Sequence, residues 1–152
     1  MFHVVLFEPE IPPNTGNIIR LCANTGAGLH LIHPLGFTLE DKQLRRAGLD
    51  YNEFARIQEY QSLEEFIHKV RPRYIYAATT RGKQNYTEVS YQPGDAFLFG
   101  PETRGLPQQL LETFPLAHII RIPMQKTSRS LNLSNAVSVI LYEALRQNNF
   151  PF

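Results

Sequence analysis

Short apolar runs alternate with helical patterns along almost the whole chain, and this alternation limits the folds that the sequence can adopt. The runs predict strands, and apolar residues spaced three and four apart predict helices. Alternating strands and helices are typical of an α/β fold with a mostly parallel sheet flanked by helices. The expected strands are 2–7, 29–32, 57–60, 74–79, 96–100 and 118–122, and the expected helices are 14–24, 40–47, 63–70, 108–114 and 135–147.

Residue types at the expected helix ends support these boundaries. Asn14 or Thr15 is expected to cap the first helix, Ser62 the helix at 63–70, and Ser134 the last helix. The side chains of these residues can accept hydrogen bonds from the free N–H groups at a helix start. Gly26 is a natural stop for the first helix. The helix expected at 40–47 should end near Gly48.

Length and composition favour one domain, 1–152, with an ordinary core, since 43% of the residues are hydrophobic. No apolar run approaches the roughly 20 residues that a membrane helix needs. The chain shows no secretory signal pattern. Its single Cys22 cannot form an internal disulfide and fits a buried small hydrophobe. We therefore expect a cytoplasmic protein.

The formal net charge of +1 gives little overall attraction for nucleic acid, so any RNA binding must use local cations. One group of cations is Lys42, Arg45 and Arg46, which are spaced three and four apart on an expected helix and fit either a solvated helix face or an RNA contact. A second group lies in and beside the later loops and consists of Arg104, Arg121, Lys126 and Arg129.

Common metal and nucleotide motifs are missing from the sequence. Gly26-Ala-Gly28 lacks the third glycine of a dinucleotide fingerprint, and there is no phosphate-binding GxxxxGK[ST]. His30 and His33 are three apart on an expected strand, so they should point to opposite faces. We expect no metal site.

Three polar segments remain, and two of them follow expected strands, where open parallel sheets bind ligands. The first, 8–20, holds Asn14 and also Arg20, which fits either a surface arginine or a phosphate contact. The second, 99–105, holds Gly100, suited to a close backbone approach, and Glu102, whose simplest role is to cap backbone amides. The third, 122–135, carries more hydroxyls and amides than a helix cap needs: Ser128, Ser130, Asn132, Ser134 and Asn135.

In their order along the chain, these segments resemble the three motifs of the SPOUT superfamily of RNA methyltransferases, in its SpoU branch of ribose 2′-O-methyltransferases. The motifs are Asn14 with Arg20, then Phe99-Gly-Pro-Glu102, then Ser130-Leu-Asn132-Leu-Ser-Asn135. The short chain and the segment 13–26 are most similar to the subgroup that methylates cytidine or uridine at position 34 of tRNA.

The resemblance implies a deep trefoil knot near the C-terminus, which periodicity cannot suggest because true knots are rare. It implies homodimers with shared active sites and S-adenosylmethionine as cofactor, with S-adenosylhomocysteine as product. The cofactor residues that it implies are Ala78, Thr79, Gly100, Glu102, Ile122, Met124, Ser130 and Leu131.

It also implies catalytic roles for Asn14, Arg20, Ser130 and Asn132. A free arginine is a poor base because its pKa lies above about 12, so we expect Arg20 to clamp a phosphate while the other three orient the ribose. Arg104, Lys126 and Arg129 are the further expected contacts to the RNA backbone.

Two alternatives stay open. One is a 2′-O-methyltransferase for rRNA or another tRNA site, and the other is an RNA-binding module without catalysis. The last expected helix is apolar on more than one side, with Val139 and Tyr142 outside its main stripe. This pattern fits a dimer interface and core burial equally well, and the resemblance favours the dimer.

Overall fold

The computed structural model describes residues 1–46, 53 and 56–152, and the described strands form one sheet in the order β3-β2-β1-β6-β4-β7-β5. Every strand pair in it is parallel, so the predicted α/β architecture is confirmed. In chain order the elements are β1 (His3–Phe7), α1 (Pro12–Thr25), β2 (Gly28–Ile32), α2 (Lys42–Arg45), β3 (Ile57–Tyr60), α4 (Leu63–Val70), β4 (Ile75–Ala78), β5 (Gln84–Asn85), the 3-10 helix η1 (Tyr86–Glu88), β6 (Ala96–Phe99), α5 (Gln108–Leu111), the 3-10 helix η2 (Leu116–His118), β7 (Ile119–Arg121) and α6 (Leu133–Gln147).

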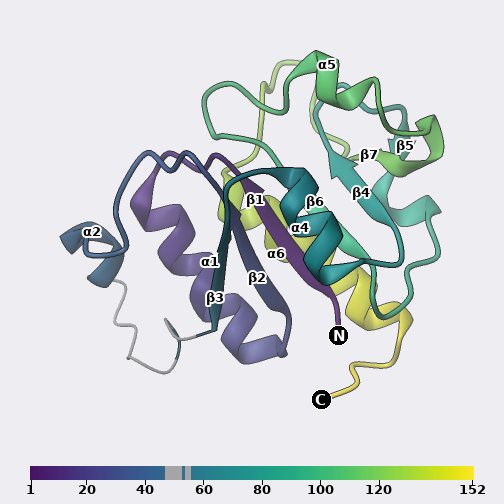
Figure 1. Cartoon of the computed structure of the whole chain (residues 1–152). Coiled ribbons are helices and arrows are strands. Elements are labelled where there is room, and N and C mark those ends of the chain that lie inside the picture. The colour runs from purple at the N-terminus through teal and green to yellow at the C-terminus, as the bar shows by residue number, and fades with distance from the viewer. Residues whose placement is uncertain (47–52, 54–55) are drawn as a thin grey trace.

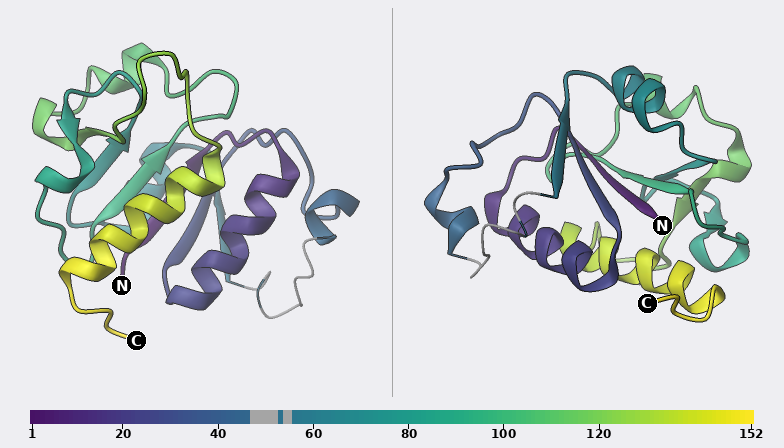
Figure 2. Two further views of the ribbon diagram at one scale, coloured as in Figure 1. Left: turned by 180° about the vertical axis from the view of Figure 1, so that it is seen from behind. Right: turned by 60° about the horizontal axis from the view of Figure 1, so that its bottom comes forward.

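Helices cover both faces of the sheet. Figures 1 and 2 show α1 and α6 side by side on one face and α4 on the other. Because successive residues of a strand point to opposite faces of the sheet, β1 contributes side chains to the hydrophobic cores on both faces. Val4 and Leu6 pack in the core beneath α1 and α6, whereas Val5 packs in the core beneath α4.

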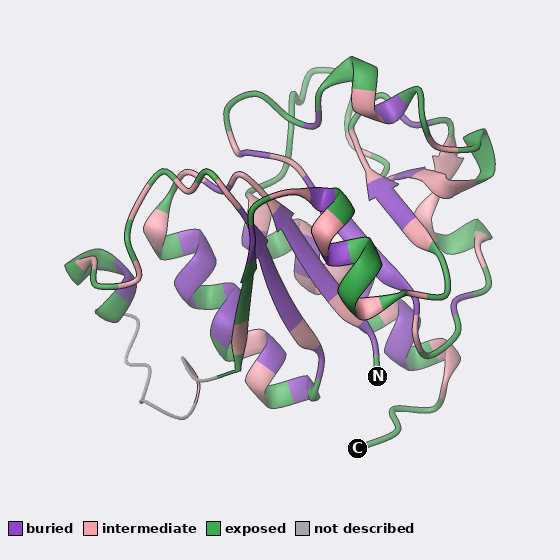
Figure 3. Cartoon of the chain, in the orientation of Figure 1, coloured by how far each residue is buried: buried purple, intermediate pink, exposed green. Residues whose placement is uncertain are grey.

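The centre of the sheet explains the most apolar run of the sequence. All four residues of β6 are buried, as expected for a strand with neighbours on both edges and a helical layer on both faces. Figure 3 shows the buried residues concentrated in the central strands and on the inward sides of α1 and α6. Within the described residues, no helix has the length and apolar character to cross a membrane.

Two helix starts differ from the sequence-based expectation. Helix α1 begins at Pro12, not after Asn14, and Ile11 at its N-cap makes no side-chain cap. Prolines suit this first turn because they lack the N–H that would be left free there. Helix α6 begins at Leu133 and is capped by Asn132, so the prediction of Ser134 as its cap was wrong. The caps expected from Ser62 and Gly26 are confirmed.

The remaining differences concern boundaries. Strand β3 has the expected bounds and β2 begins one residue earlier than expected, whereas β1, β4, β6, β7 and α5 are shorter than expected by one to three residues. Helix α2 covers only Lys42–Arg45 after its cap Asp41. The expected end of that helix, from residue 47 to Gly48, lies outside the described residues. Strand β5 was not predicted, because Gln84 and Asn85 carry no apolar pattern.

A chain of polar side chains, buried at His30 and Tyr60, links the first three strands. His3 Nδ1 lies 3.0 Å from His30 Nε2, and His30 Nδ1 lies 2.9 Å from the Tyr60 hydroxyl, which donates to Gln58 Oε1 at 2.7 Å. Since the Tyr60 proton is used on Gln58, His30 donates to Tyr60 and accepts from His3. Burial lowers the pKa of His30 to about 3, so its ring is neutral in the folded protein.

Candidate active site

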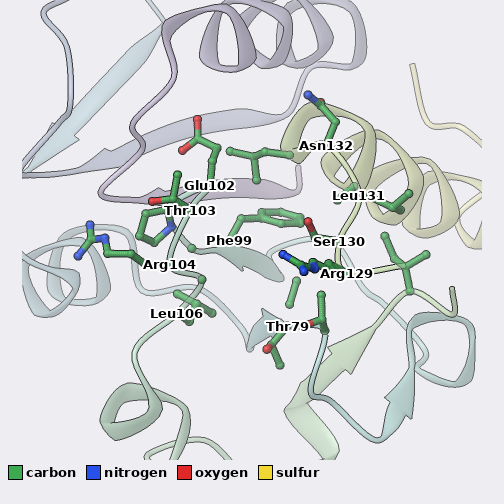
Figure 4. Close-up of a pocket in the computed structure, with 18 of the residues that line it drawn as sticks. Thr79, Phe99, Glu102, Thr103, Arg104, Leu106, Arg129, Ser130, Leu131 and Asn132 are labelled. Carbon is green, nitrogen blue, oxygen red and sulfur yellow. The ribbon is translucent and has the colours of Figure 1, made fainter. Parts of the chain in front are cut away.

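A cavity of about 650 Å³ opens at the carboxyl edge of the sheet. Its walls come from the loops that follow β4, β6 and β7, from the start of α1 and from the segment that leads into α6 (Figure 4). Parallel strands place all their carboxyl ends at one edge, which is why loops far apart in the sequence meet here. The volume lies within the roughly 300–1,000 Å³ usual for cavities that enclose a small-molecule ligand.

Most of the site residues predicted from the sequence line this cavity. They are Asn14, Ala78, Thr79, Gly100, Glu102, Arg104, Ile122, Met124, Arg129, Ser130, Leu131 and Asn132. Two predicted residues do not: Lys126 is exposed on the loop before α6, and Arg20 lies more than one turn beyond Asn14 on α1. The Arg20 Nε lies 3.5 Å from Glu53 Oε2, and its side chain is 47% exposed.

Asn132 joins the start of α6 to α1. Its Oδ1 accepts hydrogen bonds from the Ser134 N–H, the Ser134 hydroxyl and the Asn135 N–H. Its Nδ2 donates to Asn14 Oδ1 at 2.9 Å. The capping oxygen is therefore fully used, and the hydrogen that remains on Nδ2 makes Asn132 a donor toward a ligand.

Glu102 fixes the loop after β6 against the start of α1. Its two carboxylate oxygens accept from the N–H groups of Glu10 at 2.8 Å and Ile11 at 2.7 Å, and Oε2 also accepts from Asn14 Nδ2 at 3.3 Å. Glu102 thus ties the two residues that precede α1, and Asn14 in its first turn, to the loop after β6. Figure 4 shows this carboxylate turned away from Arg104. The two backbone bonds agree with the capping of amides expected for Glu102.

Glu10 makes the reciprocal contact, which the sequence did not indicate. Its Oε1 accepts from the Thr103 N–H at 2.9 Å and from the Thr103 hydroxyl at 2.7 Å. These bonds, the backbone one first, lower the pKa of Glu10. Arg104 adds ion pairs to Glu8 at 3.2 Å and Glu10 at 3.6 Å, so its charge is already partly balanced within the chain.

Gly100 permits the sharp return of this loop. A Cβ at this position would lie 2.3 Å from the Leu106 nitrogen and 2.5 Å from the Gly105 carbonyl carbon. The close backbone approach expected at Gly100 is therefore made by the loop itself. Gly105 has φ +69°, a conformation that favours glycine, and it completes the turn.

Two further arginines line the cavity: Arg81, which the sequence did not single out, and Arg121, which it offered only as a local cation for RNA. Arg81 donates to the Leu106 carbonyl at 3.4 Å. Arg121 lies at the end of β7, and its Nε is buried without a hydrogen-bond acceptor among the described residues. A buried donor of a guanidinium is costly to leave unpaired, so this nitrogen suits an acceptor on a bound ligand. Among the described residues, no group of three or more His, Cys, Asp or Glu could hold a metal ion.

The sequence profile of the SpoU rRNA Methylase family matches residues 1–142. This chain belongs to that family. It is 59% identical to the tRNA (cytidine(34)-2′-O)-methyltransferase of Yersinia pestis, over 99% of this chain and 96% of that protein.

Solved structures agree with the sequence match. One described as giving structural insights into the 2-OH methylation of C/U34 on tRNA has a TM-score of 0.90 at 44% identity and covers 98% of this chain and 97% of its own. The AdoMet-bound rRNA methyltransferase from Sinorhizobium meliloti has a TM-score of 0.80 at 29% identity and covers 95% of this chain but 56% of its own.

Proposed function

We propose that this protein transfers a methyl group from S-adenosylmethionine to the ribose 2′-hydroxyl of the cytidine or uridine at position 34 of tRNA. The observation that carries the proposal is that the three motif segments meet around one cavity, in a chain that matches a tRNA (cytidine(34)-2′-O)-methyltransferase over almost its full length. The match to that protein supports tRNA as substrate over the rRNA of the family's description. We propose that residues 1–152 act as one methyltransferase domain, in the cytoplasm.

The cavity residues fit this cofactor. Bound S-adenosylmethionine supplies an electrophilic methyl carbon on a sulfonium and leaves as S-adenosylhomocysteine. The loops at Ala78–Thr79, Gly100, Ile122–Met124 and Ser130–Leu131 would hold it, largely through backbone groups. The buried Nε of Arg121 offers one further donor for an acceptor of the ligand. Glu102 would keep the Gly100 loop in the shape that binds it.

The chain's contribution to the transfer is mainly orientation. With S-adenosylmethionine bound, the 2′-oxygen would form a bond to the methyl carbon as the carbon–sulfur bond breaks, and the hydroxyl proton would pass to solvent water. Asn132 and Asn14 each keep one amide hydrogen that their mutual contacts do not use, so they can donate to ribose oxygens but cannot take the proton. Ser130 lines the same wall. Holding the reacting atoms in line accounts for large rate gains without a strong base.

RNA would be held by arginine and lysine side chains around the opening. Arg129 and Arg104 line the cavity, while Lys126 is exposed nearby in sequence. Phosphate contacts of this kind fix position without reading the base. Sequence-specific recognition of RNA usually targets unstacked loop bases, which suits an anticodon loop.

We further propose that two copies form a dimer through α6 and that Arg20 serves the partner's site. Tyr142 on α6 is 42% exposed, and its ring lies 6.4 Å from that of Phe150, which is also exposed. Helices α1 and α6 are neighbours on one face of the sheet, so a partner bound at α6 would lie near exposed Arg20 (Figure 2). Arg20 would then clamp a phosphate across the interface.

A complementation experiment tests the shared site. Arg20→Ala and Asn132→Ala should each be inactive alone. Co-expressed, random dimers should recover about a quarter of wild-type activity, because half the dimers are mixed and each mixed dimer has one site with both residues. No recovery, with mixed dimers present by mass spectrometry, would mean that Arg20 and Asn132 act within one subunit. A monomer in ultracentrifugation would remove the dimer altogether.

We also propose that the segments between β4 and α6 form the deep trefoil knot that the resemblance implies. Support comes from membership of the family and from the path of three separate loops to one cavity. A crystal structure traced continuously through residues 78–140 tests it.

The substrate proposal has a direct test. Transcripts that differ only in the anticodon loop are incubated with the protein and S-adenosylmethionine, and 2′-O-methylation is mapped by mass spectrometry. Methylation should occur at position 34 alone and depend on the loop. Equal rates on all transcripts, or a methyl group elsewhere, would refute the assignment to position 34. Absence of cofactor binding in calorimetry, with and without tRNA, would refute the methyltransferase.

A further inference from the structure

A second, smaller cavity of about 230 Å³ lies at the same edge of the sheet, beside the ends of β1 and β2 and the start of α4. Its walls include Phe7, Glu8, His33, Ser62 and Glu64. Among the described residues, none lines both this cavity and the larger one. S-adenosylmethionine bound in the larger cavity would therefore leave this space unfilled.

One ion pair connects the two cavities. Glu8 lines the small cavity, and its carboxylate accepts from Arg104 Nη2 at 3.2 Å. Arg104 lines the large one. Both cavities also open at the carboxyl ends of parallel strands, so a flexible polymer bound in one can extend into the other.

The chemistry of the walls restricts the occupant. The start of α4 would by itself attract an anion, but Glu64 and Glu65 occupy its first turn, Ser62 caps it, and Glu8 stands on the wall. A phosphate is therefore disfavoured. The volume is below the roughly 300 Å³ at which drug-sized ligands are enclosed, which limits the occupant to a single small ring system.

The remaining lining suits a flat heterocycle. Buried Ile32 and Leu63 give the cavity an apolar side, and half-buried Phe7 offers an aromatic ring. Aromatic rings stack on nucleobases of any sequence. The carboxylate of exposed Glu64 can accept from an exocyclic amino group, as Asp and Glu accept from the amino group of cytosine.

We propose that this cavity is a nucleobase subsite that takes an amino-bearing base, cytosine or adenine, of the same RNA strand whose ribose is methylated. The inference rests on the proposed methyltransferase function. It assigns Phe7 to stacking and Glu64 to recognition of the amino group, and it makes the small cavity the place where the loop sequence is read.

The stacking role is tested with an anticodon stem–loop RNA. Wild-type protein is first assayed for methylation of the intact RNA, and then each loop nucleotide is made abasic in turn. One abasic position should raise KM by about 10-fold, the size expected when a single base–aromatic stack is lost. Phe7→Ala should raise KM to a similar extent on intact RNA and remove the penalty at that one position. Cofactor affinity should be unchanged.

Phe114→Ala is the matched control, because Phe114 is a half-buried residue of the same core that does not line the cavity. It should keep the abasic penalty. Penalties in Phe7→Ala that equal those of wild type at every position overturn the inference while leaving the methyltransferase intact. Wild-type protein that methylates no RNA overturns the proposed function, and this inference with it.

Recognition of the amino group has its own test on a side chain whose change should not disturb folding. Glu64→Gln should lose the discrimination that wild type shows, at the position found above, between the natural base and its analogue without the amino group. Wild type should prefer the amino base by about 10-fold, in line with one good base contact. Glu112→Gln, an exposed carboxylate on another helix end, should retain the preference. A preference unchanged in Glu64→Gln would refute the assignment.

Discussion

Two chains of hydrogen-bonded side chains cross this molecule, one joining the first three strands and one at the carboxyl edge of the sheet. The His3–His30–Tyr60–Gln58 chain links neighbouring strands, and its inner members use their ring or hydroxyl groups on each other. The Glu102–Asn14–Asn132 chain links a loop and two helices, and its amides keep donors facing a cavity. We call the His3–His30–Tyr60–Gln58 chain the closed chain and the Glu102–Asn14–Asn132 chain the open chain. A closed chain can only stabilise the fold, whereas an open chain, which keeps free donors, can also bind a ligand.

The largest effect should follow from breaking the open chain at Asn132. Asn132→Asp keeps an oxygen that can cap α6 but cannot donate to Asn14 Oδ1, against which it places a negative charge. Methyl transfer should fall by about 100-fold or more, because small misplacements of reacting groups cost that much. The unfolding free energy should fall by only about 1 kcal/mol, because Asn14 Oδ1 loses its donor while the cap of α6 is kept. Initial rates and urea denaturation measure the two effects.

Asp41→Ala gives the matched control for that experiment, because Asp41 lines neither cavity. It removes the cap of α2 and should lower the unfolding free energy by about 1 kcal/mol, the usual worth of such a cap, without changing methyl transfer. If Asn132→Asp kept full activity, the amide donor would have no part in orienting the ribose.

The next largest effect concerns the carboxylate that ties the open chain to α1. Glu102→Gln keeps one oxygen but turns an NH₂ group toward backbone N–H donors. Losing charge-assisted hydrogen bonds should destabilise the protein by about 2–3 kcal/mol and weaken S-adenosylmethionine binding, since the Gly100 loop loses its anchor. Thermal denaturation and calorimetry measure both.

Glu10→Gln is the informative comparison. Both bonds that Glu10 accepts from Thr103 go to one oxygen, which glutamine retains, so its loss should be much smaller. Equal losses in Glu10→Gln and Glu102→Gln would show that charge, and not the pattern of acceptors, holds this loop.

The closed chain should affect stability alone. Tyr60→Phe leaves the His30 Nδ1–H buried without its acceptor and should cost about 1–3 kcal/mol of unfolding free energy. The values of kcat and KM should stay at wild-type levels, because the chain does not line the larger cavity. A change in kcat at constant stability would mean that the two networks are coupled.

The sequence predicted the open chain better than the details of its geometry. Apolar runs located the strands because they are buried on both faces, and the motif resemblance selected Asn14, Glu102 and Asn132. It could not tell that Asn132 and not Ser134 caps α6, since both residue types cap well. The Glu10–Thr103 contact joins residues 93 apart and leaves no local pattern. Arg20 lies outside the cavity because six residues along α1 turn through roughly one and two-thirds turns, so its side chain leaves the helix on a different side from Asn14.

The closed chain went unpredicted for a similar reason. His3 and His30 lie on different strands, and their contact requires knowing that β1 and β2 are neighbours in a register that pairs Val5 with His30. The expectation that His30 and His33 face opposite ways agrees with their separate partners, Tyr60 and Glu59. Pairing of strands is a property of the whole sheet, so single-strand patterns cannot supply it.

A pH dependence should also distinguish the two chains. Burial holds the folded pKa of His30 at about 3, whereas an unfolded histidine has a pKa near 6.5. Between these values the unfolded chain binds a proton that the folded chain excludes, so stability falls as the pH is lowered. The slope from this group should approach about 1.4 kcal/mol per pH unit below pH 6. Urea denaturation between pH 7 and pH 4.5 measures it. In His30→Gln the slope should decrease by that amount, whereas His68→Gln, at an exposed position, should keep it. A wild-type slope that persists in His30→Gln would place the titrating group elsewhere and remove the neutral histidine from the account of the closed chain.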